Sequence, residues 1–144
     1  MTQDPDVRQV AAAVRLSLGL LIRRLRQTPV EGGLANPESS ALARLERGGP
    51  ATASELAKLE QISPQSMGAT LAELERRGLV ERRADPDDGR RAVLSLTRAG
   101  RRARRSRTDA RTGQIAEALA GFSRAELKQL MAAAPLLERL AENI

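Results

Sequence analysis

The chain has 144 residues, which is enough for one substantial core or a small domain with a helical extension, but too short for two independent domains. It contains no Cys and no His, so disulfides, thiolate metal sites and the commonest general base are excluded. We therefore expect no metal, no cofactor and no enzyme activity. The formal charge is +6, and the whole excess lies in residues 73–111, which hold 13 Arg against seven acidic residues.

That local excess of positive charge favours a polyanionic partner, either nucleic acid or an anionic membrane surface. Phe122 is the only aromatic residue, whereas interfacial helices and proteins that bind single-stranded nucleic acid usually carry several rings. The longest apolar stretch, 10–22, is interrupted by Arg15, is too short to span a bilayer and lacks the features of a secretory signal. We therefore expect a cytoplasmic protein that binds duplex DNA and no membrane.

A long helix with a wide apolar stripe is the first element predicted. Asp4 before Pro5 is typical of an N-cap followed by a first-turn proline, and the helical pattern continues until Pro29. After a loop, Asn36 caps a second helix, which ends at the Gly-Gly-Pro of 48–50. The residues expected in the stripe of the first helix and the core of the second are Val7, Val10, Ala11, Val14, Leu18, Leu21, Ile22, Leu25, Leu42 and Leu45.

The next two helices are short and lie about three residues apart, which is the connection length of a helix-turn-helix. Thr52 and Glu55 form a capping box that opens a third helix ending near Glu60. Ser63 then opens a fourth helix, which Gly78 closes as a C-cap. The residues expected to be buried in these two helices are Leu56, Leu59, Met67, Leu71 and Leu74.

A β-hairpin is predicted after the fourth helix, because the apolar period changes there. Residues 79–83 and 92–97 alternate well enough to be two strands. Between them, Asp-Pro-Asp-Asp-Gly at 85–89 is a concentrated turn signal, and Arg90 and Arg91 follow it. We therefore expect a hairpin with a basic tip.

Two more helices complete the chain. Residues 98–120 permit a helix that is rich in Arg around its circumference, which suits a solvated surface more than a binding stripe. Ser123 and Glu126 form a second capping box, which opens a last amphipathic helix. Pro135 lies inside that helix and is expected to kink or split it.

A short helix, a tight turn, a second helix and an Arg-tipped hairpin together suit duplex DNA. The major groove admits one α-helix and presents base edges to its outward side chains, while the narrow minor groove attracts an Arg-bearing loop. We expect outward side chains of the fourth helix at base edges, and helix N-terminal hydroxyls and flanking arginines at phosphates. The residues in these roles are Thr52, Ser54, Ser63, Gln65, Ser66, Ala69, Thr70, Arg76, Arg77, Arg90 and Arg91.

Three segments of this region resemble the wing signature of the MarR (multiple antibiotic resistance regulator) family. They are Leu-Glu-Arg-Arg-Gly-Leu-Val-Glu-Arg at 74–82, Asp-Pro-Asp-Asp-Gly-Arg-Arg at 85–91 and Leu-Ser-Leu-Thr-Arg-Ala-Gly at 94–100. The helix order resembles that of the family over nearly the whole chain. The resemblance implies a mainly α fold with a small β-hairpin, in which a winged helix-turn-helix is flanked by dimerisation helices.

The resemblance also implies a homodimer that binds a pseudo-palindromic operator in adjacent major grooves. The implied parts are an N-terminal dimerisation helix in 1–30, a winged DNA-binding domain in 36–100 and C-terminal dimerisation helices in 101–144. In the wing, the resemblance assigns Asp88 to orient Arg90 for entry into the minor groove. The residues expected at the dimer interface are Val7, Val10, Val14, Leu18, Leu21, Leu127, Leu130, Leu137 and Leu140.

Control by a small molecule is a further implication of the resemblance, because the family's effector pocket lies between the dimerisation helices and the winged module and typically takes anionic aromatic compounds. Gly68 and Ala69 stand where the family often has Thr-Arg, so fewer long side chains reach the bases. We expect a transcriptional regulator that acts as a repressor by occlusion. Two alternatives stay open: a basic RNA-binding or ribosome-associated protein, and a winged-helix module for protein interaction or a small enzyme.

Overall fold

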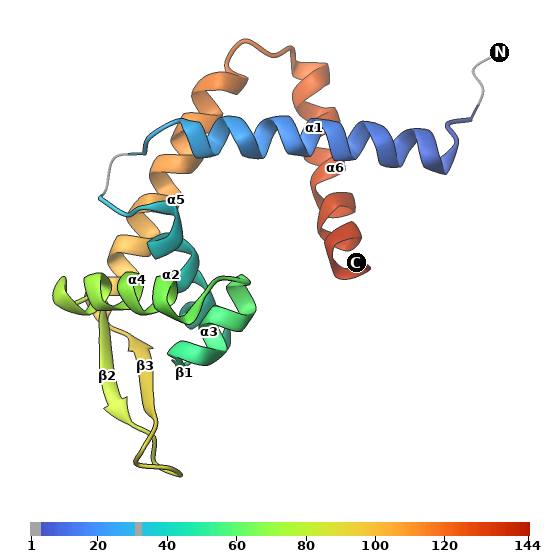
Figure 1. Ribbon diagram of the computed structural model, residues 1–144. Coiled ribbons are helices and arrows are strands. Elements are labelled where there is room, and N and C mark those ends of the chain that lie inside the picture. The colour runs from blue at the N-terminus through green and yellow to red at the C-terminus, as the bar shows by residue number, and fades with distance from the viewer. Residues whose placement is uncertain (1–3, 31–32) are drawn as a thin grey trace. The chain divides into compact units, whose positions relative to one another are not determined.

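The computed structural model describes residues 4–30 and 33–144 (Figure 1). Part of the predicted loop between the first two helices therefore lies outside the described residues. The helices and strands of the described residues are α1 (Val7–Gln27), α2 (Asn36–Gly48), β1 (Ala51–Thr52), α3 (Ala53–Glu60), α4 (Pro64–Arg76), β2 (Val80–Ala84), β3 (Ala92–Leu96), α5 (Arg98–Leu119) and α6 (Arg124–Glu142). The chain divides inside α5 into two compact units, Met1–Arg107 and Thr108–Ile144. Among the described residues, no helix combines the length and the hydropathy that a membrane span requires.

α1 is one continuous helix that starts later than the sequence signals predicted. Asp6 is the N-cap residue, so the predicted start at Asp4 and Pro5 is wrong. The side chain of Asp6 makes no cap hydrogen bond, and local signals do not distinguish starts two residues apart. The helix ends as predicted, where the Thr28 N–H donates to the Arg24 carbonyl oxygen. No residue of α1 is buried.

The first unit is organised around a core shared by α2, α3, α4 and the strands. Leu42 and Leu71 are fully buried in this core, as their helical spacing predicted. The buried apolar residues are Leu34, Ala41, Leu42, Leu45, Leu56, Ala57, Met67, Leu71, Leu74, Leu79, Val80, Leu94 and Leu96. Leu59 was expected among them but is 54% exposed, because the short helix α3 turns its Leu56 and Ala57 side toward the core.

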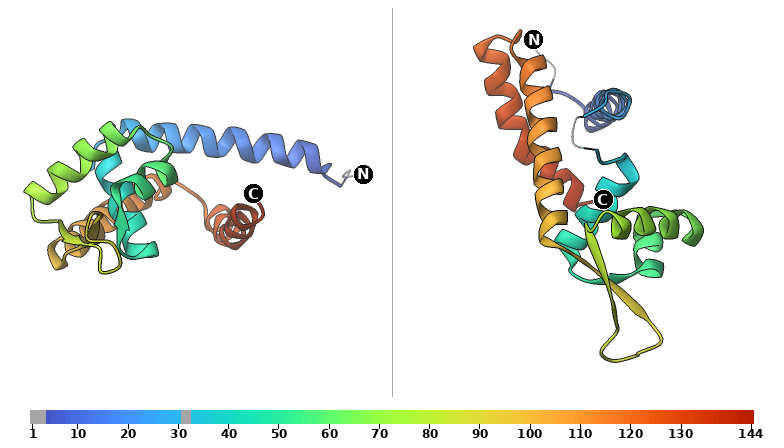
Figure 2. Two further views of the ribbon diagram at one scale, coloured as in Figure 1. Left: turned by 60° about the horizontal axis from the view of Figure 1, so that its bottom comes forward. Right: turned by 90° about the vertical axis from the view of Figure 1, so that its left-hand side faces the viewer.

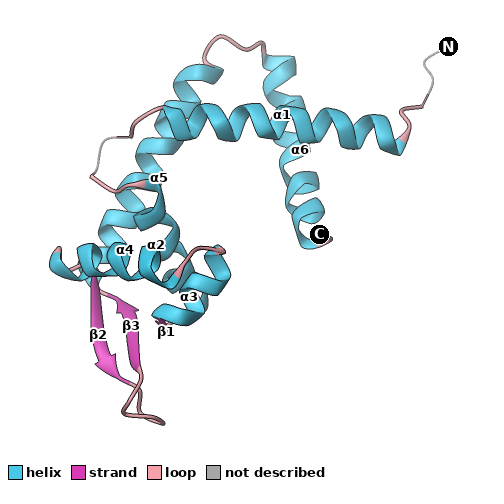
Figure 3. Cartoon of the chain, viewed as in Figure 1, coloured by secondary structure: helices cyan, strands magenta, loops and turns pink. Residues whose placement is uncertain are grey.

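A three-stranded antiparallel sheet in the order β1-β3-β2 completes this unit (Figure 3). The predicted hairpin is confirmed, since Val80 pairs with Leu96 and Ala84 pairs with Ala92. The sequence did not predict β1, because a strand of two residues shows no alternating pattern. Thr52 of β1 pairs with β3, so this strand holds the start of α3 against the hairpin.

The hairpin of β2 and β3 with its turn, residues 80–96, projects beyond the helices of its own unit and is called the wing below (Figure 2). Thr97 anchors the base of the wing: its hydroxyl donates to the Gly78 carbonyl oxygen at 2.7 Å and accepts from the Gly100 N–H at 3.0 Å. Gly78 was predicted as the C-cap of α4, but the C-cap is Arg77, and Gly78 follows it with a φ of 71°, the left-handed conformation of a glycine that ends a helix. The wing is therefore fixed where α4 ends and α5 begins.

Two arginines in the first half of α5 bond to the segment around α2. Arg107 donates to the Leu34 carbonyl oxygen and to the Asn36 side-chain oxygen, both at 2.6 Å. Arg104 pairs with Glu46, with 3.2 Å between Nε and Oε2. The expectation that the arginines of this helix are simply solvated is therefore wrong for these two. Their partners lie far away along the chain, so no local sequence pattern predicts these bonds.

The second unit consists of the end of α5 and of α6. Ser123 and Glu126 form the predicted capping box at the start of α6. A kink or a split was predicted at Pro135; α6 runs through Pro135 as one helix, so the helix is not split there. Proline removes one helix N–H, but Met131, four positions earlier, is exposed, and water can therefore bond its carbonyl oxygen. No residue of this unit is buried in the described chain.

Candidate nucleic-acid interface

α4 has one buried side and one exposed side. The helix begins at the Ser63 cap, whose hydroxyl oxygen accepts from the Ser66 N–H at 3.1 Å. The residues on the exposed side are Gln65, Ser66, Gly68, Ala69, Ala72 and Arg76. Of the side chains predicted at base edges, Gln65, Ser66 and Ala69 therefore lie on one open surface. Thr70 is half-buried at its edge.

An ion pair stands at the C-terminal end of this exposed side. The Glu73 carboxylate accepts from Arg76 through both of its oxygens: Oε2 lies 2.8 Å from Nε, and Oε1 bonds Nη2. This hydrogen bonding lowers the pKa of Glu73 and raises the pKa of Arg76. Arg76 is nevertheless 71% exposed, so a partner can still reach its guanidinium.

Arg77 was expected near a phosphate, but its side chain is turned toward the start of α2. Its Nη1 atom donates to the Gly33 carbonyl oxygen at 2.7 Å and to Glu38 Oε2 at 3.1 Å. Arg77 is 28% exposed in this position. It therefore connects the end of α4 to α2 and has protein partners for its charge.

The start of α3 lies beside the wing. Thr52 is 9% exposed; its hydroxyl accepts from the Glu55 N–H and its own N–H donates to the Glu55 carboxylate, which confirms the predicted capping box. Ser54 is exposed and lines, together with Arg82 and Arg91, an open hollow of about 440 Å³. Arg82 is paired with Glu75 and Arg91 with Glu55, so the N-terminus of α3 is the part of this hollow that favours an anion.

Aspartate side chains hold the turn of the wing. Asp85 accepts from the Asp87 N–H at 2.9 Å, and Asp88 accepts from the Arg90 N–H at 3.1 Å. Asp88 thus orients the backbone of Arg90. The Arg90 side chain is exposed and has no bonded partner among the described residues. The tip therefore offers this guanidinium to an outside partner.

Bonds between side chains connect the wing to the helix-turn-helix. Arg91 Nη2 donates to Glu55 Oε1 at 2.9 Å. The other oxygen of Glu55 accepts from the Thr52 N–H, so one carboxylate joins the cap of α3 to the wing. On β2, Arg82 donates to Glu75 of α4 at 3.3 Å. The wing is therefore tied to both short helices.

Known proteins are similar to this chain in both sequence and fold. The profile of the MarR family matches residues 33–91. An uncharacterized HTH-type transcriptional regulator of Mycobacterium bovis is 32% identical over 140 residues, which cover 97% of this chain and 97% of the relative. The chain belongs to the MarR family. A solved structure from Pseudomonas aeruginosa, described as a transcriptional regulator, is 34% identical, covers 93% of this chain and 95% of its own, and has a TM-score of 0.73.

The MarR-family chain is a transcriptional regulator with a winged helix-turn-helix, and it is not an enzyme. The sequence predictions of family and fold class are therefore confirmed. A structure of a mutant of S. aureus MepR bound to an oligodeoxyribonucleotide has the same fold, with a TM-score of 0.65 at 21% identity. That match covers 94% of this chain and 98% of the MepR chain.

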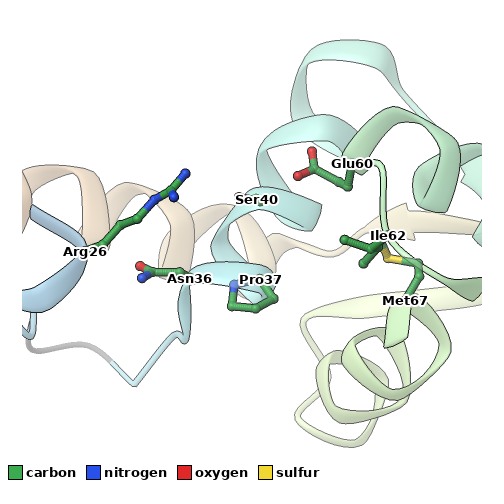
Figure 4. A pocket seen from close by; sticks show the side chains of 7 residues that line it. All are labelled: Arg26, Asn36, Pro37, Ser40, Glu60, Ile62 and Met67. Atoms are coloured by element: carbon green, nitrogen blue, oxygen red, sulfur yellow. The ribbon is translucent and has the colours of Figure 1, made fainter. Parts of the chain in front are cut away.

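The MarR-family chain also has a pocket at the start of α2 (Figure 4). Its volume is about 340 Å³. It is lined by Arg26, Asn36, Pro37, Ser40, Glu60, Ile62 and Met67. Ile62 and Met67 lie next to each other in the close-up, so the pocket combines a small apolar patch with one cationic and one anionic side chain.

Sequence reasoning missed three residues of this MarR-family surface. Ala72 was detectable, because it follows Gln65 by seven residues and so shares its face of α4. Arg82 was detectable from the alternation of β2. Glu55 was recognised as a capping residue, but its bond to Arg91 spans 36 residues and leaves no local signal.

Proposed function

We propose that the protein is a homodimeric repressor that binds a pseudo-palindromic duplex operator and occludes it from other proteins. The exposed side of α4 enters the major groove, and Arg90 enters the adjacent minor groove. The observation that carries this proposal is the unpartnered Arg90 at the tip of an anchored, slender hairpin, within the described residues. The fold shared with MepR, whose structure holds an oligodeoxyribonucleotide, supports it.

The dimensions of B-form DNA agree with this arrangement. The major groove is about 12 Å wide and admits one α-helix, whereas the minor groove, about 6 Å wide, admits only a narrow element. Short side chains at Gly68, Ala69 and Ala72 allow α4 to approach the base edges closely. Gln65 then lies at one end of the reading surface, and Arg76 lies at the other.

Phosphates are bound at the start of α3 and along the side of the wing. The N-terminus of α3, where Ser54 lines the hollow, carries the positive end of the helix dipole; Arg82 and Arg91 also line the hollow, but each is paired with a glutamate. A phosphate held in this hollow fixes the register of the protein on the duplex without reading its sequence. Thr52 contributes indirectly, since its hydroxyl is engaged in the cap of α3.

The homodimer is supported by apolar side chains that one chain leaves exposed. α1 and α6 are both amphipathic, yet neither contains a buried residue. Their exposed large apolar side chains are Val7, Val10, Leu16, Leu20, Leu21, Ile22, Leu127, Leu130, Met131, Leu136, Leu137 and Leu140. Val14 and Leu18, also predicted at the interface, are half-buried. Covering such surface with a second copy is favourable by about 25 cal/mol for each Å² of apolar area.

Regulation by a small molecule is assigned to the pocket in Figure 4. Glu60 in the lining is paired with Arg44, so Arg26 together with Ile62 and Met67 suits a small anionic compound with an apolar body. Met67 belongs to α4, so a bound compound contacts the reading helix directly. Such a ligand changes DNA affinity to the extent that it prefers a conformation unable to bind DNA.

The experiment that tests the proposal compares Arg90→Ala with the wild-type chain in titrations of duplex DNA. We expect binding to weaken about tenfold or more, while the circular dichroism spectrum stays unchanged. Arg8→Ala removes the same charge from α1 and serves as the matched control, with nearly wild-type affinity expected. Wild-type affinity of Arg90→Ala would contradict the role given to the wing.

A competition with duplex RNA at matched salt separates the main alternative. A major-groove reader cannot enter the narrow major groove of A-form RNA, so we expect a strong preference for DNA. Equal affinity for the two duplexes would favour an RNA-binding protein. A DNA affinity that does not fall with rising salt would instead favour a module for protein interaction.

A further inference from the structure

We propose that Glu73 is a positioning residue that holds Arg76 for the recognition of a guanine, so that each operator half-site has a G·C pair under the C-terminal end of α4. The inference rests on the proposed function and goes beyond it by naming a base and the pair of residues that selects it. It replaces the expectation that Arg76 contacts a phosphate.

Arg76 lies on the face of α4 that is directed away from the core. Gln65, Ala69 and Ala72 recur at helical spacing on the same face, and all are exposed. Glu73 is one turn before Arg76, at the edge of this face, and is half-buried. A helix that enters the major groove with this face brings Arg76 to the base edges and keeps Glu73 beside it.

The ion pair uses one edge of the Arg76 guanidinium and leaves the other edge available. Glu73 accepts from Nε and from Nη2. Because the five N–H donors of a guanidinium lie in one plane, both Nη1 hydrogens and the second Nη2 hydrogen point away from the carboxylate. Two parallel donors of this kind match O6 and N7 of guanine, whereas adenine presents a donor at N6.

The negative charge of Glu73 disfavours a phosphate as the partner of Arg76. The pair is neutral as a whole, so binding a phosphate there releases few counterions, and the carboxylate repels an anion placed beside it. An arginine held by a carboxylate also keeps its free edge in one orientation, which suits a planar pair of acceptors. The hydrogen bonding lowers the pKa of Glu73 and raises that of Arg76, so it favours the charged form of both groups.

Short side chains on the same face bring the pair within reach of the bases. Gly68, Ala69 and Ala72 extend little beyond the helix backbone, and no atom lies within 4 Å of a Cβ built on Gly68. Between Gln65 and Arg76, the exposed side of α4 therefore carries no long side chain that would hold its backbone away from the groove floor.

The test begins with duplexes that the wild-type full-length chain selects from a random-sequence pool. We expect one guanine to recur at the same place in each half-site. Replacing that guanine by 7-deazaguanine removes the N7 acceptor, and wild-type binding should weaken about tenfold. Titrations of the two duplexes therefore measure the discrimination for guanine directly.

Variants then identify the residues that produce this discrimination. Arg76→Lys keeps the charge but lacks the planar fork, so we expect the two duplexes to bind about equally. Glu73→Gln keeps the shape and removes the charge, so we expect discrimination to fall several-fold while affinity for unrelated duplexes equals or exceeds that of the wild type. Glu75→Gln, which changes the neighbouring glutamate that bonds Arg82, is the matched control and should discriminate like the wild type.

Any of four results would overturn the inference: no recurring guanine, full discrimination by Arg76→Lys, full discrimination by Glu73→Gln, or an Arg76→Ala variant that loses affinity equally for every duplex. The last result, with a logarithmic salt slope reduced by about 0.9, is the behaviour of a phosphate contact. If the wild-type chain bound no duplex even in dilute buffer, the proposed function would fail and the inference with it. Circular dichroism of each variant checks that the fold is retained.

Discussion

Gly100 lies against Leu79 so closely that a Cβ atom built on Gly100 would be 2.1 Å from the Leu79 carbonyl oxygen. The same oxygen accepts from the Thr97 N–H at 3.1 Å, and the Thr97 hydroxyl bonds Gly78. The first turn of α5 therefore crosses the chain between α4 and β2 where no side chain fits. This close contact explains why the wing signature ends in Thr-Arg-Ala-Gly: the threonine bonds the chain before β2, and the glycine leaves room for it.

We predict that Gly100→Ala lowers the free energy of unfolding by about 1–3 kcal/mol or more, because the backbone of α5 must move away from Leu79. Gly113→Ala is the matched control in the same helix, since no atom lies within 4 Å of its added Cβ. The control should be unchanged or more stable by about 0.5–1 kcal/mol. Urea denaturation measures both variants, and equal stability of the two would contradict the close contact.

The bond between Glu55 and Arg91 predicts an energetic coupling between the wing and α3. Both side chains are about half exposed, so a double-mutant cycle of Glu55→Gln and Arg91→Ala should give a coupling of about 0.2–1 kcal/mol in the free energy of unfolding. Glu55→Ala should cost more than Glu55→Gln, because the Thr52 N–H then loses its acceptor as well. Additive effects of Glu55→Gln and Arg91→Ala would show that the bond does not contribute.

Local chemistry explains which parts of the fold the sequence predicted. The caps of α3, α4 and α6 each depend on residues three positions apart, at Thr52, Ser63 and Ser123, and all three were predicted. The turn of the wing was predicted for the same reason, because Asp85 and Asp88 bond backbone groups two residues away. Where a side chain forms its hydrogen bonds with residues two or three positions away, a short stretch of sequence is enough to predict the local structure.

Tertiary contacts explain what the sequence did not show. Arg77, predicted near a phosphate, bonds Glu38, and Arg107, expected to be solvated, bonds Leu34 and Asn36. These partners come from the segment around α2, far away in the chain, and arginine has the length to reach either solvent or a distant acceptor. Exposed arginines in a basic sequence therefore cannot be divided into binding and structural ones by pattern alone.

The exposed apolar side of α6 is part of the proposed dimer interface. We therefore predict that one charged residue placed on this side disrupts the dimer. Leu130→Asp places a carboxylate in the proposed interface, and a two-fold axis repeats the change in both copies, so we expect the dimerisation constant to fall by at least about 30-fold. Lys128→Asp introduces the same group on the opposite side of α6 and should leave the dimer intact. Analytical ultracentrifugation distinguishes the states, and a wild-type chain that sediments as a monomer would contradict the proposed interface.

The cap of α6 predicts how stability changes with pH. The Ser123 backbone N–H donates to the Glu126 carboxylate at 2.7 Å, and this hydrogen bond is the main cause of a lowered pKa of Glu126 in the folded state. Hydrogen bonding with the Ser123 side chain lowers the pKa further. A carboxyl group with a lowered folded pKa stabilises the fold fully above its unfolded pKa, about 4.3, and this contribution is lost as the pH falls through the folded value.

The difference in Tm between the wild type and Glu126→Gln should therefore be constant from pH 7 to about 5 and shrink below that. Gln keeps an oxygen that can accept from the Ser123 N–H, so the variant removes the charge and its titration while the neutral hydrogen bond stays. Protein concentration must be equal in all melts, because a dimer's Tm rises with concentration. A difference that stayed constant down to pH 3 would mean that the Glu126 charge makes no contribution to the cap, and that α6 is held by its apolar side alone.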